Sequence, residues 1–456
     1  MGTSKLVGYS VIIITIAFIF GCSSEPEVNE AVINASFTVA DSIDSSGDYS
    51  GIGLTIVHKD SANASADTLF HAVTDSAGTL KGTARFSERN EYLSYISRNG
   101  RNLARVGLIL ADKDTLDIKA EFPGIEQTFT VSSREHDAMN VYQRVNRSFE
   151  RVRAFMQAGR VSQDSIGIEL QKWSDIYWEV YKDYEGTLAS QMGASESIRL
   201  LQGWNNEQMM ERIKQVREND DLVGLAATYG KDYLAEQEGL DYAVSYLDTL
   251  YKITEGKQAK MQIQMEQIKL LYDSAKVEAA KTRLASFNDQ FEGNKQAQDW
   301  AENISYDLNY LAPGDTIPSF LFRENGQTIS RDSLIGTPYI LEITTLSNRL
   351  YQQQYDRTVV IHSIYKNYGL QIITLPLEDS QVTVDAFFEE RIKPWPVADA
   401  NAFDRAKLLE DFNIQLIPTR FLIDAEGKIY RKYVGREYQD VIQGIQALTD
   451  TERQPS

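Results

Sequence analysis

The order of apolar segments in the C-terminal third of the chain restricts the fold more than any other feature. Tyr339–Ile343 is almost wholly apolar, which is typical of a buried strand. We expect a long helix after it, reaching about Lys366, and a second strand over Leu370–Leu375. Ala425-Glu426-Gly427 has the composition of a turn and predicts a hairpin between two further strands. Strand, helix, strand and hairpin together predict an α/β domain over residues 312–450.

Short sequence motifs punctuate the same region. In chain order they are Ala312-Pro313-Gly314-Asp315, Pro394-Trp395-Pro396, Ile417-Pro418-Thr419 and Phe421-Leu422-Ile423-Asp424. This series closely resembles the TlpA/ResA-like and AhpC/TSA branch of the thioredoxin superfamily. The resemblance implies a thioredoxin-like fold in which Pro418 is a cis-proline, a bond geometry that is nearly confined to X–Pro bonds. It also implies that the backbone of Ile417 faces a groove, where relatives bind an extended substrate chain.

The redox site of that family is missing from this sequence. Relatives carry a Trp-Cys-x-x-Cys motif where the first strand meets the helix, and a thiolate there is stabilised by the helix N-terminus. Aligning Tyr339–Thr344 with the family strand places Ser347-Asn348-Arg349-Leu350 at the Cys-x-x-Cys position. The one cysteine of the chain is Cys22, and a serine hydroxyl cannot exchange disulfides. The sequence therefore predicts a redox-inactive domain with no catalytic residue.

What remains at this position is predicted to be a vestigial groove. Its residues are Ser347, Asn348, Arg349, Leu350, Ile417, Pro418 and Thr419. We expect Thr344, Thr345 and Ser347 to cap the helix that follows, because their hydroxyls can accept backbone N–H groups. Glu342 is unusual within an apolar strand. If it is buried, its carboxyl group needs a partner or a raised pKa.

The single cysteine lies at the end of an apolar N-terminal run. Val11–Phe20 is nearly free of polar residues, and it is too short and too early for a stable membrane span. Gly21 precedes Cys22, and this arrangement resembles the lipobox of bacterial lipoproteins. The resemblance implies a signal peptide over residues 1–21, cleavage before Cys22, and acyl chains that anchor Cys22 in membrane lipid. Ser23 takes the place of an aspartate that retains some lipoproteins at the inner membrane, so we expect an outer-membrane location in the cell envelope.

Composition argues against several other classes of protein. Lys and Arg number 46 against 65 Asp and Glu, which gives a net charge of −19. Nucleic-acid binding needs a basic footprint, so no nucleic-acid partner is expected. A lone cysteine forms no intramolecular disulfide and no cysteine-rich zinc site. The four histidines, His58, His71, His136 and His362, lack the spacing of a metal site, and no metal or other cofactor is expected.

A β-rich region is expected to follow the anchor. Residues 22–31 form a short acidic tether, and residues 32–132 contain short alternating segments separated by turn residues. The clearest strands are Ala35–Val39, Leu54–Val57, Val106–Leu110 and Leu116–Ile118, and the clearest turns are Asp75–Gly78 and Ala111–Asp114. We expect a small antiparallel β-sandwich over residues 32–132.

Residues 133–311 are expected to form an all-α region. Trp173, Tyr177, Tyr181 and Tyr184 recur at helical spacing, as do Met261, Met265, Ile268 and Tyr272. Such stripes are interpreted as helix packing, with a ligand groove as the alternative. Glycines at Gly159, Gly193, Gly203, Gly230, Gly239 and Gly256 divide the region into about five to seven helices. With a polar tail over residues 451–456, the whole chain is predicted to be multidomain α+β.

Three hypotheses about function follow from these features. The first is an envelope lipoprotein whose redox-inactive groove binds a protein or peptide partner, with a scaffold role for the helices. The second is a member of the thiol-disulfide oxidoreductase family that works with cysteines supplied by a partner, or that uses an unrelated chemistry. The third is an accessory lipoprotein that handles solutes or glycans at the outer membrane. The sequence leaves the partner, the side of the membrane and the oligomeric state open.

Overall fold

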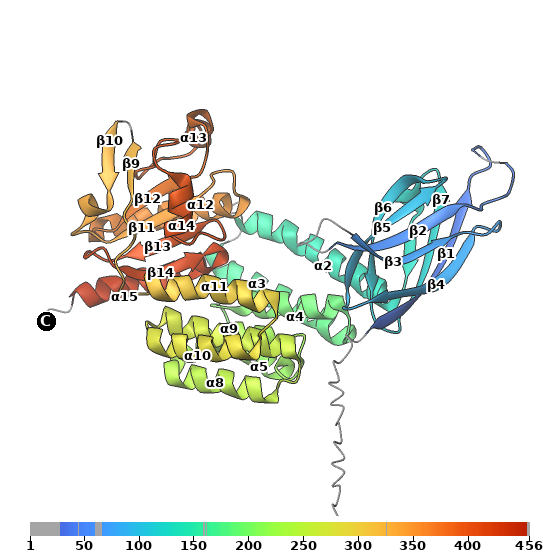
Figure 1. Cartoon of the computed structure of the whole chain (residues 1–456), viewed down its shortest axis with the longest axis horizontal. Helices are drawn as coiled ribbons and strands as arrows, with labels where there is room; N and C mark the ends of the chain where they lie inside the picture. The colour runs from blue at the N-terminus through green and yellow to red at the C-terminus, as the bar shows by residue number, and fades with distance from the viewer. Residues whose placement is uncertain are drawn as a thin grey trace, which may run out of the picture. The chain divides into compact units, whose positions relative to one another are not determined.

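The computed structural model describes residues 28–43, 45–59, 66–157, 160, 162–324 and 326–453 (Figure 1). The chain forms two compact units, which divide between Leu200 and Leu201. The expected signal peptide and Cys22 lie outside the described residues. The first strand, β1, begins at Asn29, so it takes up the end of the segment predicted to be a tether.

The N-terminal unit begins with two four-stranded β-sheets that share one apolar core (Figure 1). The first sheet has the order β4-β1-β7-β8, with bounds Thr79–Phe86, Asn29–Val39, Thr115–Phe122 and Thr130–Ser132. The second has the order β3-β2-β5-β6, with bounds Ala66–Val73, Ile52–Lys59, Asn90–Arg98 and Arg101–Leu110. A short helix, α1 (Ile125–Thr128), lies between β7 and β8. Alternate side chains of each strand enter the core; in β1 these are Ala31, Ile33, Ala35, Phe37 and Val39.

The four clearest strand segments of the sequence lie within β1, β2, β6 and β7. The turn predicted at Asp75–Gly78 is also confirmed. Asp75 Oδ1 accepts the backbone N–H of Ala77 at 3.0 Å and that of Thr79 at 2.9 Å. Gly78 has a φ of 79°, a conformation that glycine adopts without a steric penalty. Local turn chemistry therefore gave reliable strand ends in this unit.

The prediction of a purely antiparallel sandwich is wrong at one strand pair. β1 and β7 run parallel, in register from Val32 opposite Thr115 to Val39 opposite Phe122. Between β1 and β7 in the sequence, the chain adds β4 to one side of β1 and forms the four strands of the second sheet. β7 then pairs with the other side of β1 and runs in the same direction as β1. A half-buried strand alternates in the same way in either orientation, and the sequence pattern therefore could not reveal this pairing.

Three long helices complete the N-terminal unit: α2 (Arg134–Gln157), α3 (Gln163–Asp183) and α4 (Leu188–Leu201). The aromatic stripe of α3 packs against α2, as the packing interpretation predicts. Tyr177 is fully buried, its ring centre lies 5.8 Å from that of Tyr142, and its hydroxyl donates to Asn146 at 2.9 Å. Gly193 lies within α4 instead of ending a helix. A Cβ at this position would lie 2.8 Å from the carbonyl oxygen of Tyr177, so Gly193 allows α3 and α4 to approach closely.

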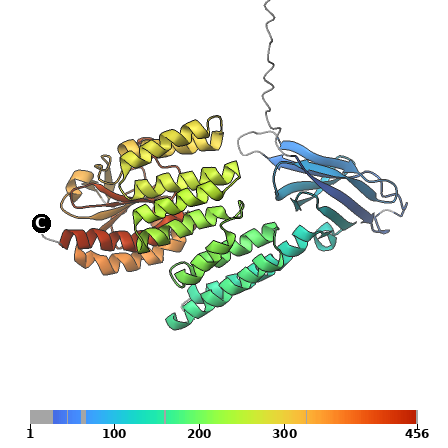
Figure 2. The ribbon, with the colours of Figure 1, turned by 90° about the horizontal axis from the view of Figure 1, so that it is seen from below.

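The C-terminal unit starts with a helical region (Figure 2). Its helices are α5 (Asn206–Val216), α6 (Val223–Leu225), α7 (Lys231–Gln237), α8 (Leu240–Ile253), α9 (Lys257–Asp273), α10 (Val277–Gln290) and α11 (Lys295–Tyr310). A π-helical turn over Ala226–Gly230 joins α6 to α7, so Gly230 continues a helix instead of breaking it. Conversely, Ala275 follows α9 at a φ of 57° where the sequence has no glycine. The described part of residues 133–310 therefore has more helices than the glycines predicted.

The rest of the C-terminal unit is a four-stranded sheet with helices on both faces (Figure 1). The strand order is β12-β11-β13-β14, with bounds Gln371–Pro376, Tyr339–Thr344, Thr419–Ile423 and Ile429–Val434. β11 and β12 are parallel, whereas β13 is antiparallel to both β11 and β14. Helices α12 (Arg349–Tyr365) and α15 (Val441–Arg453) cover one face, and α14 (Arg405–Asp411) packs on the other. The β9–β10 hairpin (Leu321–Glu324, Gln327–Ser330) and α13 (Gln381–Phe388) complete this part.

The predicted order of strand, helix, strand and hairpin is confirmed in this sheet. Ala425–Gly427 forms the turn between β13 and β14, and the Ile417–Pro418 peptide bond is cis. The C-terminal part of the chain therefore has a thioredoxin-like fold. α15 extends to Arg453, so the segment predicted to be a polar tail begins inside a helix.

Both outer strands of this sheet are partly covered by other segments. Thr374 of β12 exchanges backbone hydrogen bonds with Pro396 and Ala398, each at 3.0 Å. Ile429 of β14 exchanges backbone hydrogen bonds with Gly314 and Asp315, at 2.7 and 2.8 Å. Short crossing segments thus satisfy part of the backbone at each edge of the sheet.

Candidate functional site

The site predicted from the sequence lies in the loop between β11 and α12. Asn348 is the N-cap of α12, because its side-chain oxygen accepts the backbone N–H of Tyr351 at 3.0 Å. The prediction that Thr344, Thr345 and Ser347 cap this helix is wrong. Asn348 directly precedes the first helical residue with an extended backbone, and asparagine caps helices as well as serine does. Ser347 is consequently left exposed at the surface.

The loop meets the segment that carries the cis-proline. Asn348 Nδ2 donates to the carbonyl oxygen of Ile417 at 3.3 Å, which links the two segments. The tips of Leu350 and Leu416 both approach Gly435: a Cβ added there would lie 3.9 Å from Leu350 and 3.4 Å from Leu416. Leu416 is 57% exposed. Apolar side chains therefore line the position at which the resemblance places the second thiol.

The seven residues predicted for the groove come from two segments that the structure brings together, Ser347–Leu350 and Ile417–Thr419. Neighbouring carbonyl groups are already bonded. The Pro418 oxygen accepts the Gly435 N–H at 2.8 Å, and the Leu416 oxygen accepts the Thr419 hydroxyl at 2.6 Å. Within the described part of the chain, the N–H of Ile417 has no hydrogen-bond partner. An extended chain in the groove can therefore accept a hydrogen bond from the N–H of Ile417. An N–H of that chain that donates to the Ile417 carbonyl oxygen would share this acceptor with the side chain of Asn348.

A buried carboxyl group lies beneath the loop. Glu378 is 7% exposed, and one of its oxygens accepts the backbone N–H of Leu346 at 2.5 Å. The other oxygen is buried and has no hydrogen-bond partner among the described residues. Burial raises the pKa of Glu378, and the hydrogen bond from Leu346 opposes that shift. Glu378 thus engages a backbone N–H close to the N-terminus of α12, where an anion is favoured.

Changing Glu378 to glutamine is expected to alter the pH dependence of stability. Because the pKa of Glu378 is raised in the folded state, its contribution to stability is full below about pH 4.5 and is lost as the pH rises through the folded pKa. Glu378→Gln removes this loss. The free energy of unfolding of the variant should therefore exceed that of the wild type by up to about 1 kcal/mol near pH 7.5, and should equal it near pH 4. Urea unfolding at several pH values measures the effect, and Glu389→Gln, at an exposed position, is the control. Identical pH slopes for the wild type and Glu378→Gln would contradict this account.

A fully buried ion pair lies behind the groove. Glu342 in β11 and Arg420 in β13 have side chains with 0% exposure, and Arg420 Nε donates to Glu342 at 2.6 Å. The second carboxylate oxygen of Glu342 accepts the Thr374 hydroxyl at 2.8 Å. Arg420 also donates to Gln354 of α12 at 2.8 Å, and its guanidinium carbon lies 3.8 Å from the ring centre of Tyr438. Glu342 is therefore buried, and its charge is paired.

This buried cluster is connected to the groove at two points. Arg420 directly follows Thr419, and the Gln354 amide donates to the carbonyl oxygen of Gly435 at 3.1 Å. Sequence reasoning raised Glu342 but missed Arg420. The available signal was an arginine inside the apolar run Thr419–Ile423, opposite a strand that carries an acid. The ion pair holds β11, β13 and α12 together beside the groove.

A serine–histidine contact in the N-terminal unit does not form a catalytic pair. Ser133 Oγ and His136 Nδ1 are 2.9 Å apart. His136 Nε2 accepts the backbone N–H of Ile109 at 3.3 Å, so the ring proton is on Nδ1 and is donated to Ser133. Ser133 Oγ also accepts the backbone N–H of His136 at 3.2 Å, as a helix cap does. His136 therefore cannot act as a base toward Ser133 in this arrangement.

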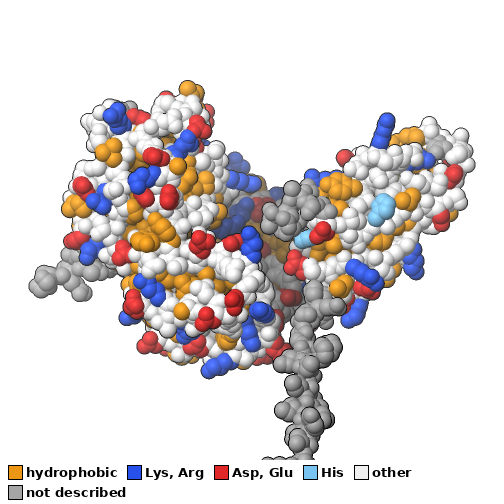
Figure 3. Space-filling view, viewed as in Figure 1, with side chains coloured by type: hydrophobic (Ala, Val, Ile, Leu, Met, Phe, Trp, Pro, Cys, Tyr) orange, Lys and Arg blue, Asp and Glu red, His pale blue; other side chains and the backbone are white. Residues whose placement is uncertain are grey.

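Acidic and basic side chains are interspersed over the visible face of the C-terminal unit (Figure 3).

No helix among the described residues is long and apolar enough to cross a bilayer. The described residues also contain no group of three or more His, Cys, Asp or Glu side chains that could hold a metal ion. Cys22 lies outside the described residues, so its lipidation stays a prediction, as does the lack of a nucleic-acid partner.

Comparison with curated proteins finds relatives of one kind, although no protein-family model matches the chain. The thiol-disulfide oxidoreductase ResA of Bacillus cereus is 24% identical over 146 residues, which is 31% of this chain and 82% of the relative. The protein of the same name from Bacillus anthracis is 23% identical over 140 residues, which is 30% of this chain and 79% of the relative.

Solved structures that match the chain carry similar names. A thiol:disulfide interchange protein of the thioredoxin family from Chlorobium tepidum has 23% identity and a TM-score of 0.27, and the match covers 30% of this chain and 98% of the other. The thioredoxin domain of a thiol-disulfide oxidoreductase from Bacteroides vulgatus has 18% identity and a TM-score of 0.28, with coverage of 29% and 97%. The sequence similarity, the strand order and the cis-proline support the assignment of a thioredoxin-like domain. About 30% of the chain is thus a thioredoxin-like domain homologous to thiol-disulfide oxidoreductases of the ResA type.

Proposed function

We propose that this chain is an envelope lipoprotein that binds a protein or peptide partner in the groove of its thioredoxin-like domain and does not itself exchange disulfides. The observation that carries the proposal is the composition of the groove. Ser347 and Leu350 occupy the two positions at which the resemblance places thiols, and Cys22 is the single cysteine of the sequence. Disulfide exchange proceeds through a mixed disulfide on a thiolate, which no side chain of the groove can form.

Several features of the groove favour binding of an extended chain. The N–H of Ile417 has no hydrogen-bond partner within the described part of the chain and can donate to a partner backbone, as in strand addition. Leu416 is exposed, and Leu350 lies close to it over Gly435. An apolar side chain of the partner that covers these leucines gains about 25 cal/mol for each Å² of apolar surface removed from water. Backbone pairing would give affinity, and the leucines would give selectivity.

The proposal includes a membrane anchor at Cys22. The motif of Gly21 and Cys22 after an apolar run supports it. Because β1 begins at Asn29, an acylated Cys22 would keep the N-terminal unit within about 25 Å of the lipid surface, at roughly 3.3–3.6 Å per extended residue. Mass spectrometry of the protein purified from its native host, with Cys22→Ser as the control, tests whether acyl chains are attached.

A second candidate function is disulfide exchange in which both thiols come from partners. Similarity to ResA favours it. In this case the groove would hold a thiol-bearing protein and its substrate without donating electrons. Addition of the purified full chain to an insulin-reduction assay driven by dithiothreitol should leave the rate unchanged under both proposals, so only a thiol partner from the native membrane can separate them.

The groove proposal predicts a position-dependent cross-link. A photo-cross-linking residue, p-benzoylphenylalanine, is placed at Leu416 or, as the matched control, at Leu321 of β9, whose exposure is 56% against 57% for Leu416. In the native host, we expect one discrete adduct from position 416 and at least about a fivefold lower yield of it from position 321. Ser347→Arg, which puts a long charged side chain into the groove, should abolish the adduct at 416. Equal adducts from both positions, or none at 416, would overturn the proposal.

A further inference from the structure

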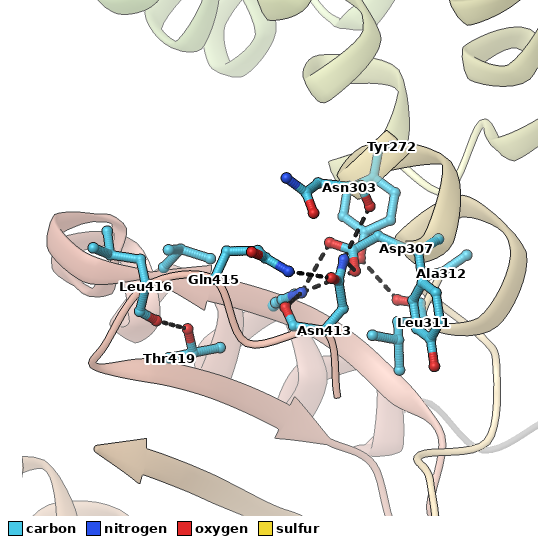
Figure 4. A network of polar contacts seen from close by, with 12 residues as sticks. Tyr272, Asn303, Asp307, Leu311, Ala312, Asn413, Gln415, Leu416 and Thr419 are labelled. Atoms are coloured by element: carbon cyan, nitrogen blue, oxygen red, sulfur yellow. Dashed lines mark hydrogen bonds and ion pairs between the residues drawn. The ribbon is translucent and has the colours of Figure 1, made fainter. Parts of the chain in front are cut away.

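The loop that leads to the cis-proline is attached to helix α11 by a second buried charged cluster (Figure 4). Asp307 of α11 accepts from Lys432 of β14 through both carboxylate oxygens, each at 2.9 Å. The same carboxylate accepts Asn413 Nδ2 at 2.9 Å, and that amide also donates to the carbonyl oxygen of Asn303 at 3.0 Å. Asn413 is therefore held by α11 through two hydrogen bonds from one side-chain nitrogen.

The attachment point lies a few residues before the groove. Asn413 has a φ of 45°, and its side-chain oxygen accepts Gln415 Nε2 at 2.9 Å. Lys432 Nζ donates to the carbonyl oxygen of Asn413 at 3.2 Å, so main chain and side chain are fixed together. Leu416 follows, and its carbonyl oxygen accepts the Thr419 hydroxyl (Figure 4). Hydrogen bonds thus link α11 to Asn413 and Asn413 to Gln415, and a separate hydrogen bond joins Thr419 to Leu416 across the cis peptide.

The charges of this cluster explain why an asparagine is needed. Asp307 and Lys432 are both buried, and the charge of each is compensated by the opposite charge of the other. A neutral amide can donate to Asp307 without disturbing this balance, whereas a carboxylate at position 413 would face Asp307 with like charge. Asparagine is also one of the few residues that tolerate a positive φ. Position 413 therefore meets a conformational and a hydrogen-bonding requirement at once.

We infer that α11 positions the binding groove, and that Asp307 and Asn413 are positioning residues for it. The groove is then a composite of the thioredoxin-like sheet and the helical region, because α11 holds Asn413, which lies three residues before Leu416. The inference depends on the proposed function for the statement that the groove binds a partner. The attachment of the loop itself does not depend on that function.

The test compares two positive-φ asparagines of the same unit. Asn413→Gly keeps the backbone conformation accessible and removes only the side chain. Asn401→Gly, at a φ of 57° and an exposed site, is the matched control. Asn413→Asp is a second variant. It keeps the size of the side chain and the ability to adopt a positive φ, but it places a second negative charge next to Asp307. A nitroxide label is attached to L416C in a Cys22→Ser full-length protein, and its mobility is read by electron paramagnetic resonance.

We expect Asn413→Gly and Asn413→Asp to convert the label at position 416 to a mobile spectrum, with no change in Asn401→Gly. In the cross-linking experiment, both variants at position 413 should lower the adduct yield from position 416 at least about fivefold. An unchanged label spectrum in both variants would overturn the inference. So would a mobile label with an unchanged adduct yield. If position 416 gives no adduct in the otherwise unaltered protein, the proposed function fails, and the label spectra still decide whether α11 holds the loop.

Discussion

Replacing Arg420 with methionine is expected to lower the free energy of unfolding of the C-terminal unit by about 3–5 kcal/mol. The substitution leaves the carboxylate of Glu342 buried with 0% exposure and without its cation. It also removes the hydrogen bond to Gln354 and the stacking of the guanidinium on Tyr438. Urea unfolding followed by hydrogen exchange in β11 and β13 measures the loss in the unit concerned.

A paired substitution separates the ion pair from the volume it fills. In Glu342→Gln with Arg420→Met, no charge is stranded, and we expect more than half of the lost stability to return. The amide can still accept from Thr374, whose hydroxyl lies 2.8 Å from the present carboxylate. If Arg420→Met alone costs less than about 1 kcal/mol, then the buried charge is compensated in some other way, and the cluster does not hold the groove elements together.

Installing two cysteines in the groove is expected to create an activity that the wild type lacks. The change is Ser347→Cys with Leu350→Cys in a Cys22→Ser protein. Positions 347 and 350 have the spacing of the Cys-x-x-Cys pair of the relatives, which forms a disulfide at this place in the fold. The N-terminus of α12 favours a thiolate, although the nearby carboxyl group of Glu378 opposes it. We expect an intramolecular disulfide after oxidation, and insulin reduction at about ten times the rate with dithiothreitol alone.

A cysteine pair elsewhere on α12 is the control for this gain. Val360→Cys with Ser363→Cys has the same spacing on an exposed part of the helix, away from its N-terminus and from the cis-proline. It should not accelerate insulin reduction. Two free thiols at positions 347 and 350 after treatment with oxidised glutathione would show that these residues do not occupy the redox position of the fold. Adding Glu378→Gln to the groove pair should make the dithiol faster, because an opposing carboxyl group is removed.

The features that the sequence predicted are those determined by neighbours in the chain. The apolar run Tyr339–Ile343, the turn at Ala425–Gly427 and the turn at Asp75–Gly78 all reflect local structure, and the structure contains each of them. Pro418 was identified through the resemblance, and its bond is cis. The position of the groove followed from the same alignment, because the loop after a family strand can be placed once the strand is known.

The features that the sequence did not predict depend on partners far along the chain. Arg420 and Glu342 are separated by 78 positions, and Lys432 and Asp307 by 125. No spacing rule connects residues so far apart in the sequence. The sequence alone therefore does not distinguish these buried charged residues from ordinary polar residues between apolar ones. The sequence does not single out Asn348 as the cap because three hydroxyl residues stand close by, and only the backbone conformation decides which residue starts the helix.

The covered edges of the thioredoxin-like sheet have a consequence for self-association. Exposed edge strands can template pairing between copies of a protein, and a lipid anchor would concentrate copies in two dimensions. The crossing segments at Thr374 and Ile429 occupy backbone groups that a second sheet would otherwise use. Pairing of copies through the edges of this sheet would then be disfavoured, even for a protein crowded on a membrane.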